Sequence, residues 1–442
     1  MNTSTSKIFI FFILTYLALA SLNGLVTIFA YNTTRLILLY KDFFSIVFPL
    51  LMIFFFVANG YKAGRQFTTL MLTLLAICFF ILSYILATLL FSKFDMTRIA
   101  IQFRVELFAI SAILIAALAS MFSTEEKKNI VSVFIKFYII FCSINALATI
   151  AEFFSAELIF QVLGFNPGPM LTAFGKDNGL VLRTTDGYLR ALGLLTTPFS
   201  LSEYLFFGLA LASFVSAKRR ALFTFLMIAG ILCSTSKTAF VMMVIYVLYM
   251  SINRLVSNQR ALRFITWITV VVSIVFFLSV TNTFIYEVFS SKENTYAENS
   301  IFLRILYIEQ VLDSAYSIYF GSGYAVNGSG MVGVEDNTTA IPLDSLYIYL
   351  LSNYGFVGVL VFAFGAFLLL VSLYKKTSTV LPHGVYLYWL ISLLTNFAYN
   401  NPFTNYPGYI FPIIITALLV SLKPEEYSDE EGSANPVYTK VS

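Results

Sequence analysis

The chain has 442 residues, of which 59% are hydrophobic and 11% are charged, and its formal net charge is +4. A soluble globular protein carries about 25% charged residues, so this composition excludes an ordinary soluble domain. Lys and Arg concentrate in short loops between apolar segments, as in membrane proteins, so the small positive excess indicates no nucleic-acid partner.

Apolar runs recur along the whole sequence and predict an all-α polytopic membrane protein. Backbone in lipid must satisfy its own hydrogen bonds, which long apolar runs do as helices, and these runs lack the alternation of barrel strands. About twelve segments are candidate transmembrane helices: Ile8–Ala30, Phe43–Asn59, Phe67–Phe91, Val105–Phe122, Val131–Phe154, Leu201–Ala217, Ala221–Cys233, Thr238–Ile252, Phe264–Val280, Leu346–Leu373, Val385–Phe397 and Tyr409–Leu422. The first is too long for a cleaved signal core, and we interpret it as a retained span.

The distribution of basic residues predicts the orientation of these spans. With the N-terminus inside, the inner loops hold most of the loop Lys and Arg residues: Lys62, Arg65, Lys127, Lys128, Lys218, Arg219, Arg220, Arg254, Arg260, Arg263, Lys375 and Lys376. The short outer loops hold fewer: Arg35, Lys41, Lys93, Arg98 and Arg104. We therefore expect a single transmembrane domain over residues 1–422 with both termini in the cytoplasm, and a disordered acidic cytoplasmic tail over 423–442.

This orientation places two long polar loops on the same outer face, at about 155–200 and 282–345. Within the second loop, Ile301–Ser317 has apolar residues near helical spacing and predicts a helix on the membrane surface or against the first loop. No repeat of fixed period and no second soluble domain is evident.

The cysteine and histidine content argues against several kinds of site. Cys78, Cys142 and Cys233 lie within hydrophobic segments, so we expect no disulfide and no metal cluster. His383 is the sole histidine and lies in a predicted inner loop, where we expect it to be solvated; this excludes a zinc site or a histidine-dependent triad on the outer face. No nucleotide-binding glycine motif follows a predicted strand, so we expect no cofactor.

Three arginines in the two long loops are candidates for binding an anionic substrate. Arg190 lies just before the span that begins near Leu201, and Arg304 lies on the predicted loop helix; Arg183 is a further candidate in the first loop. A guanidinium is always charged and grips phosphate oxygens with two donors, which suits a lipid-linked diphosphate. The alternatives are an interfacial arginine that reaches toward headgroups and a surface ion pair that contributes little.

Asp344 and Lys237 are candidates at the outer ends of spans. A carboxylate at the membrane surface can act as a general base, although Asp is also a favoured helix cap and Pro342 marks a helix start nearby. Lys237, in a polar turn between two short spans, either adds charge to an anionic site or is a solvated turn residue. Gly321 and Gly323 are candidates for contacting the substrate, but they more readily permit a turn than cradle a nucleotide.

Transport is the main competing class of function. A transporter usually carries ionisable residues within spans, or paired broken helices. Here the charged residues within spans are few, namely Glu106, Lys136, Glu152 and Glu203, and the others concentrate in the outer loops. This distribution favours an enzyme that acts at the membrane surface.

The order of these short motifs resembles the O-antigen polymerase and O-antigen ligase superfamily of bacterial envelope polysaccharide assembly. The motifs are Arg-x-x-Gly (Arg190, Gly193), a Ser-Lys turn (Ser236, Lys237), the loop Arg304, Gly-x-Gly (Gly321, Gly323), and Asp-x-Leu (Asp344, Leu346) followed by Gly355 and Gly358. The similarity covers roughly Arg190–Leu370. It resembles the polymerase (Wzy-type) branch more than the ligases, which usually have a histidine near the position of Asp344.

The resemblance implies a metal-independent glycosyltransferase of the C-type membrane architecture in the bacterial inner membrane, with two periplasmic loops forming the active site. Its substrate would be an undecaprenyl-diphosphate-linked oligosaccharide, transferred as a growing glycan onto a new repeat unit. Arg190 and Arg304 would hold the diphosphate, and Asp344 is our candidate base. A chain-length regulator is an expected partner. A ligase-type transfer to lipid A core or protein, and a flippase of lipid-linked sugars, are the alternatives.

Overall fold

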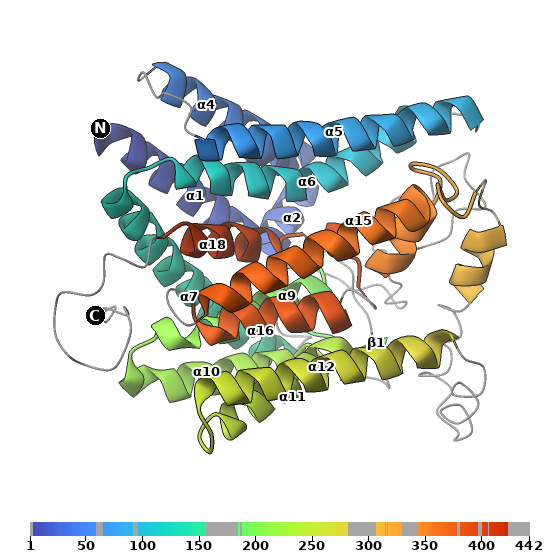
Figure 1. Cartoon of the computed structure of the whole chain (residues 1–442). Helices are drawn as coiled ribbons and strands as arrows, with labels where there is room; N and C mark the ends of the chain where they lie inside the picture. Colours follow the sequence, from blue (N-terminus) through green and yellow to red (C-terminus); the bar gives the residue numbers. More distant parts are fainter. Residues whose placement is uncertain are drawn as a thin grey trace.

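The computed structural model shows an almost wholly helical chain (Figure 1). It describes residues 3–58, 65–91, 96–155, 184–185, 188–281, 306–313, 315, 317–328, 343, 345–377, 381–396, 400–404 and 406–422, and the structural statements below concern these residues. The predicted tail over 423–442 and most of both predicted outer loops lie outside them.

The helices follow the apolar segments closely. In chain order they are α1 (Thr3–Ser21), α2 (Asn23–Asn32), η1 (Arg35–Leu39), α3 (Tyr40–Asp42), η2 (Phe43–Val47), α4 (Phe48–Ala58), α5 (Arg65–Phe91), α6 (Met96–Ser120), α7 (Thr124–Phe154), α9 (Pro198–Ala210), η3 (Ala212–Phe214), α10 (Ala217–Cys233), α11 (Lys237–Ile252), α12 (Asn258–Thr281), α15 (Leu346–Lys376), α16 (His383–Ile391), η4 (Ser392–Asn396), η5 (Pro402–Thr404) and α18 (Ile410–Ser421). A two-residue antiparallel ladder, β1 (Thr184–Thr185) with β2 (Tyr188–Leu189), precedes α9. The prediction of an all-α fold is therefore confirmed.

Polar side chains start several of these helices by binding their first free N–H groups. Ser123 and Glu126 form a reciprocal capping box at the start of α7. Thr197 accepts a hydrogen bond from the Ser200 N–H at the start of α9, and Pro198 occupies the first helical position, where its missing N–H is harmless. Ser236 caps α11 in the same way.

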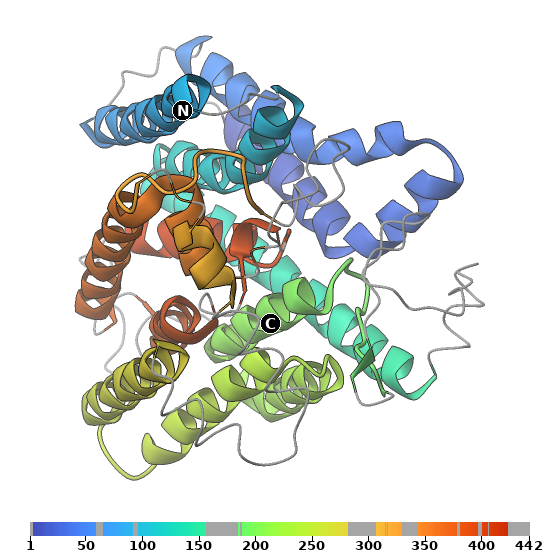
Figure 2. The same ribbon diagram turned by 90° about the vertical axis from the view of Figure 1, so that its right-hand side faces the viewer.

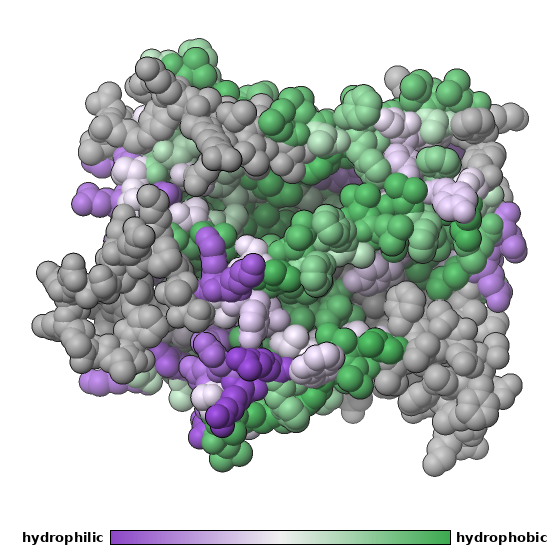
Figure 3. Space-filling model, in the orientation of Figure 1, coloured by the Kyte–Doolittle hydropathy of each residue, from purple (hydrophilic) through white to green (hydrophobic). Residues whose placement is uncertain are grey.

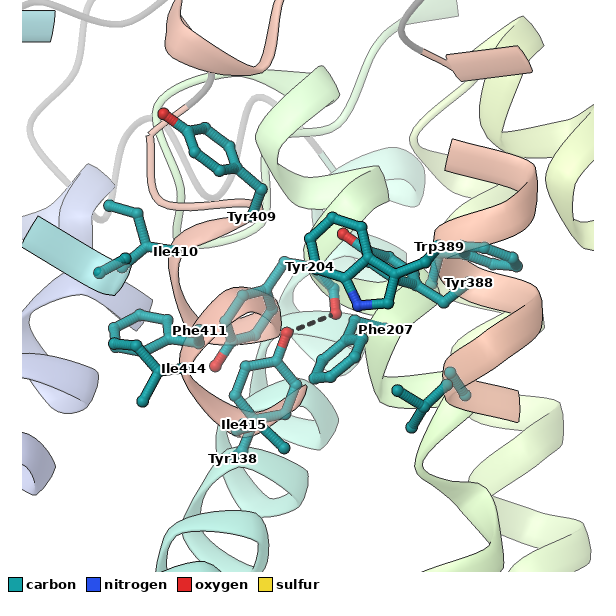
Figure 4. Close-up of a cluster of buried hydrophobic side chains, with 14 of the residues drawn as sticks. Tyr138, Tyr204, Phe207, Tyr388, Trp389, Tyr409, Ile410, Phe411, Ile414 and Ile415 are labelled. Carbon is teal, nitrogen blue, oxygen red and sulfur yellow. Dashed lines mark hydrogen bonds between the residues drawn. The ribbon is translucent and has the colours of Figure 1, made fainter. Parts of the chain in front are cut away.

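The helices pack around α9, whose described side chains are almost all buried. Figures 1 and 2 show α5 and α6 along one side of the molecule, α11 and α12 along the other, and α9, α16 and α18 between them. Among the largest contacts, α18 packs on α6, and α7 packs on α1 and α10. The core contains aromatic rings from four helices, including Tyr138, Phe207, Tyr388 and Phe411, and the Tyr138 hydroxyl donates to the Tyr204 carbonyl at 3.0 Å (Figure 4).

The outside of this bundle is strongly hydrophobic. Large exposed apolar side chains lie along α5, α12 and α15, for example Phe79, Trp267 and Phe364. Figure 3 shows hydrophobic residues across the middle of one face and hydrophilic residues toward its two ends. Such a band is costly in water and favourable in lipid, so the molecule is a membrane protein in character.

Length and composition qualify four of the described helices to cross a membrane: Leu36–Ala58, Thr97–Ser120, Thr124–Phe154 and Leu346–Lys376. A fifth is added if Thr5–Ser21 and Asn23–Ala30, which meet at an angle of 74°, count as one broken span. The other predicted spans are helical in their described parts but are shorter or only partly described. A total of about twelve spans remains a prediction.

Two further predictions concern single segments. Residues 306–313 are helical, as predicted for Ile301–Ser317, but Ala315 and Ser317 are described and lie outside the helix, so the prediction is confirmed only in part. His383 is not a solvated loop residue as predicted: it is the first residue of α16, half-buried, and its ring stacks on Tyr249 with 6.4 Å between the centroids. Burial lowers the pKa of His383, because the charged form loses hydration.

Candidate functional site

The structure describes some of the residues that the sequence nominates and not others. Arg183, Arg304 and Asp344 lie outside the described residues, so their roles stay predictions. Arg190 is described and half-buried, and the backbone of Lys237 begins α11. Gly321 and Gly323 are described in full. The site can therefore be built outward from Arg190 and from the two glycines.

Arg190 begins a short irregular segment, residues 190–197, that lies against the end of α7. The Glu152 carboxylate on α7 accepts hydrogen bonds from the backbone N–H of Leu192 at 2.8 Å and of Gly193 at 2.7 Å. Glu152 is only 3% exposed, and a buried carboxylate requires such partners. These two bonds fix the Arg190 segment to the helical body.

The backbone conformation and the packing against α7 explain why the Arg-x-x-Gly motif ends in glycine. Gly193 has a φ of +58°, a conformation that L side chains rarely adopt, and a Cβ there would lie 2.7 Å from the Thr149 hydroxyl oxygen. Any other residue would strain the backbone and push the segment away from α7. The motif spacing thus places the arginine three residues before a tight turn that α7 holds.

The same segment is held on its other side by the bend between α1 and α2. Asn145 on α7 accepts from the Leu194 N–H at 3.1 Å and donates to the Ser21 carbonyl at 3.0 Å. The Gly24 N–H donates to the Leu194 carbonyl at 2.7 Å. Asn145, Thr149 and Glu152 recur at helical spacing and share one face of α7. Polar residues within an apolar helix thus form one continuous support for the 190–197 segment.

The Gly321-Ser-Gly323 motif lies at a crossing between the segment 317–328 and α15. The Ser322 N–H donates to the Ser352 carbonyl at 2.7 Å, and the Phe356 N–H donates to the Ile318 carbonyl at 3.0 Å. α15 departs from helical geometry at Gly355, where φ is +65° and a Cβ would lie 2.2 Å from the Tyr319 carbonyl oxygen. The prediction that these glycines permit a turn is confirmed, while contact with substrate stays a prediction.

A buried carboxylate, Glu106 on α6, holds the 317–328 segment from the opposite side. Its oxygens accept from the hydroxyls of Tyr349 at 2.6 Å, Tyr354 at 2.7 Å and Tyr324 at 3.1 Å, and from the Gln102 amide at 3.1 Å. Burial and the neighbouring carboxylate raise the pKa of Tyr324 far above its ordinary value, so its hydroxyl stays protonated and donates. Glu106 therefore joins α6, the 317–328 segment and α15.

Residues 400–408, between η4 and α18, connect the other parts of the site. The Ser200 hydroxyl, in the first turn of α9, donates to the Tyr406 carbonyl at 3.0 Å. The Asn400 amide donates to the hydroxyl of Thr238, the neighbour of Lys237, at 3.1 Å. The Phe403 ring lies 5.6 Å from that of Tyr349 on α15. The structure thus brings the Arg190 segment, the Ser-Lys turn and α15 to one region.

Residues 400–408, Glu106 and Glu152 are not among the site residues that motif and residue type predict. Asn, Pro and Gly crowd into 400–408, and this composition is the signal that could have marked the segment as more than a connection. Glu106 and Glu152 were recognised as charges within spans. Apart from Gln102, one turn before Glu106, their partners lie 218–248 and 40–41 residues away in sequence and cannot be read from local spacing.

The cap of α15 bears on the interpretation of Asp344. The helix begins at Leu346, and the hydroxyl of Ser345, not Asp344, accepts the hydrogen bond from the Ile348 N–H. Both flanking residues, Leu343 and Ser345, are buried. Ser345 therefore occupies the N-cap position of α15, and for Asp344 itself, which lies outside the described residues, both the cap and the base stay predictions.

Within the described part of the chain, no three His, Cys, Asp or Glu side chains gather as a metal site would require, and the three cysteines are free thiols. The described part of the candidate site consists of two irregular segments, 190–197 and 317–328, which the buried carboxylates of Glu152 and Glu106 hold. No protein-family model, no characterised protein and no solved structure matches this chain.

Proposed function

We propose that this protein is a membrane glycosyltransferase that polymerises lipid-linked oligosaccharide units of a bacterial surface polysaccharide. It would have about twelve spans in the inner membrane, both termini in the cytoplasm, and its site on the periplasmic side. The donor would be a growing glycan on undecaprenyl diphosphate, and the acceptor a new lipid-linked repeat unit. A chain-length regulator protein would be its partner.

The contacts between helix ends support the proposed orientation. If spans alternate in direction from an inner N-terminus, the connections near residues 31–42, 190–200, 234–238 and 398–408 all belong to the outer side. Hydrogen bonds join some of these connections directly, namely Asn400 to Thr238 and Ser200 to Tyr406. Asn23, at the bend within the first predicted span, accepts from Tyr40 and donates to Thr196, and so links two others. On the assigned inner side, the Lys376 ammonium donates to the Val420 carbonyl, and Tyr249 stacks on His383.

The observation that carries the proposal is the way the Arg190 segment is built. Irregular backbone at membrane depth is tolerated only where protein satisfies it or where it lines a hydrated cavity. Here a buried carboxylate and a buried amide bind the N–H groups of three consecutive residues, Leu192–Leu194, just after a half-buried arginine. Pre-organising a cation at the outer end of a helical bundle is what transfer from an anionic lipid carrier requires.

In the proposed reaction, a hydroxyl oxygen of the acceptor sugar attacks the anomeric carbon of the donor glycan. The bond from that carbon to the diphosphate oxygen breaks, and its electron pair leaves with the lipid diphosphate. Arg190 and Arg304 would stabilise the charge that develops on the diphosphate. Asp344 would accept the hydroxyl proton. No oxidant, reductant or metal is needed for this balance.

Substitution of Arg190 tests the proposal in cells that lack the chromosomal gene. Arg190→Ala should abolish long polymer and leave single repeat units on the carrier lipid. Arg190→Lys should restore little, because a point charge does not replace a bidentate fork. Arg219→Ala is the matched control, since Arg219 is exposed in the opposite, basic connection. Polymer length is measured on gels at matched protein levels, and long polymer from Arg190→Ala would refute the assigned role.

Transport of a lipid-linked sugar is the second candidate, and the three carboxylates buried within apolar helices favour it: Glu106, Glu152 and Glu203. The break at the α1–α2 bend and the one at Gly355 are a further feature of transporters. However, Glu106 and Glu152 are occupied by donors from the protein, as structural carboxylates are. An ion-coupling or substrate-coupling carboxylate must be able to exchange partners, so we rank transport second.

A further inference from the structure

Lys41, at the start of the apolar helix that follows α2, has an unusual environment. Its ammonium lies 4.7 Å from the centroid of the Tyr406 ring and 6.0 Å from that of Tyr40. Tyr406 is only 7% exposed, so the ammonium points into the protein and not outward to headgroups, as an interfacial lysine would. Among the described residues, no carboxylate lies within ion-pair distance of Lys41.

The nearest acid is already committed to another base. Asp42 receives two hydrogen bonds from the Arg104 guanidinium, both at 2.7 Å, in a bidentate pair. Asp42 and Arg104 both lie within electrostatic range of Lys41, and their charges cancel. The group of Lys41, Asp42 and Arg104 therefore carries one net positive charge, and that charge is on Lys41. A half-buried charge without a counter-charge is expensive, which calls for an anion.

Hydroxyl groups beside this lysine also lack well-formed hydrogen bonds. The hydroxyls of Tyr16, Ser45 and Tyr406 are each more than nine-tenths buried, and none makes a hydrogen bond of normal distance and angle within the described part of the chain. Tyr16 is close enough to Ser45 and Tyr406 for weak side-chain hydrogen bonds and lies within range of the charge of Asp42, so the three hydroxyls and the charged group lie together. Buried hydroxyls are normally satisfied, and such a group is most simply explained by a bound species with acceptor oxygens.

We propose that Lys41, Tyr16, Ser45 and Tyr406 bind one phosphoryl group of a lipid. A phosphoryl group supplies both the negative charge that Lys41 lacks and the acceptor oxygens that the hydroxyls lack. The start of the apolar helix Leu36–Ala58 is the depth at which a lipid phosphate lies. The phosphate belongs either to an isoprenyl diphosphate or to a bilayer phospholipid, which share this chemistry.

The site adjoins the Arg190 segment without being part of it. The Tyr406 carbonyl accepts from Ser200 in the first turn of α9, and Tyr40 donates to Asn23, which in turn donates to Thr196. A phosphate held by Lys41 would therefore lie next to the support of the candidate site. The inference does not depend on the proposed function, since any phosphate-bearing lipid satisfies it.

The test uses the purified full-length protein in nanodiscs of phosphatidylcholine. Radiolabelled farnesyl diphosphate is the first probe, with farnesol as the uncharged control. Lys41→Met keeps the apolar stem and removes the charge; it should weaken farnesyl diphosphate binding about tenfold or more, and Lys41→Arg should retain most of it. Lys136→Met is the matched control, because Lys136 is an exposed lysine within α7. A second probe is phosphatidylglycerol in the nanodisc, with retained lipid counted by mass spectrometry.

Loss of farnesyl diphosphate binding in Lys41→Met, with farnesol unchanged, supports the site and assigns it to an isoprenyl diphosphate. Loss of retained phosphatidylglycerol alone supports the site and assigns it to a phospholipid. Wild-type behaviour of Lys41→Met toward both probes overturns the proposal. If Lys41→Met does not fold, Tyr406→Phe replaces it: the variant keeps the ring and removes one donor, and it should weaken binding about threefold or more, while unchanged binding of both probes would overturn the proposal.

Discussion

At the scale of single residues, Glu152 explains how a carboxylate within an apolar helix can serve structure. Its oxygen is bound by two backbone N–H groups of the 190–197 segment, so its charge is satisfied before any substrate arrives. A charge within a span is usually interpreted as functional. Here the geometry makes Glu152 a positioning residue, because it acts on Arg190 through the backbone between them.

Replacing Glu152 should show whether its role is to hold the 190–197 segment and not to take part in the reaction. Glu152→Ala leaves two buried N–H groups unsatisfied, and each should reduce the free energy of unfolding by about 1–3 kcal/mol. Glu152→Gln keeps an acceptor oxygen and should recover much of that loss. Thermal unfolding in detergent measures the effect, with exposed Glu125→Ala as the control. Equal stability of Glu152→Ala and Glu125→Ala would contradict the assignment.

At the scale of elements, the sequence predicts the helices well and their breaks poorly. The apolar segments are helical over most of their described parts, since apolar length and backbone satisfaction in lipid dictate this locally, but in Leu201–Ala217 the α-helix ends at Ala210. The break of α15 at Gly355 depends on residues 317–328 crossing there, and the bend at Leu22 depends on contacts with Leu194. Both are tertiary in origin, so no local pattern predicts them.

The break in α15 can be tested with a matched pair of glycines. Gly355→Ala should be strongly destabilising, because its Cβ meets the Tyr319 carbonyl and its positive φ adds about 1–2 kcal/mol of strain. Gly365→Ala, in the same helix with nothing within 4 Å of its Cβ, should be neutral or stabilising by up to about 1 kcal/mol. Unfolding temperatures and protease resistance report the difference. A Gly355→Ala protein as stable as Gly365→Ala would show that the crossing contributes little.

The candidate site, like the helices, could be predicted from sequence only in its local features and not in its tertiary contacts. The arginines, the glycines and Asp344 could be nominated from residue type and motif order. That Gly193 fits against Thr149, and that Ser345 caps α15, required the structure. Residues 400–408 could not be ranked above any other short connection, because their importance lies in contacts with Ser200 and Thr238 that are distant in sequence.

At the scale of the whole molecule, hydrogen bonds join connections that alternate along the chain, as expected for a bundle of spans with one functional face. Two carboxylates, Glu106 and Glu152, hold the two irregular segments of that face, and residues 400–408 lie between them. Hydrophobic residues form a band across the middle of the bundle, and hydrophilic residues lie toward its two ends. This arrangement suits chemistry on a substrate with a lipid tail and a sugar head.

The central claim is that the protein forms glycosidic bonds, and reconstitution tests it most directly. Purified protein in liposomes is supplied with the lipid-linked repeat unit alone, and products are separated by length. We expect a ladder of longer glycans with release of lipid diphosphate, and loss of the ladder in a normally folded Asp344→Asn variant. Repeat units that cross the bilayer without growing, or that remain unchanged in the presence of correctly folded wild-type protein, would contradict the proposed polymerase.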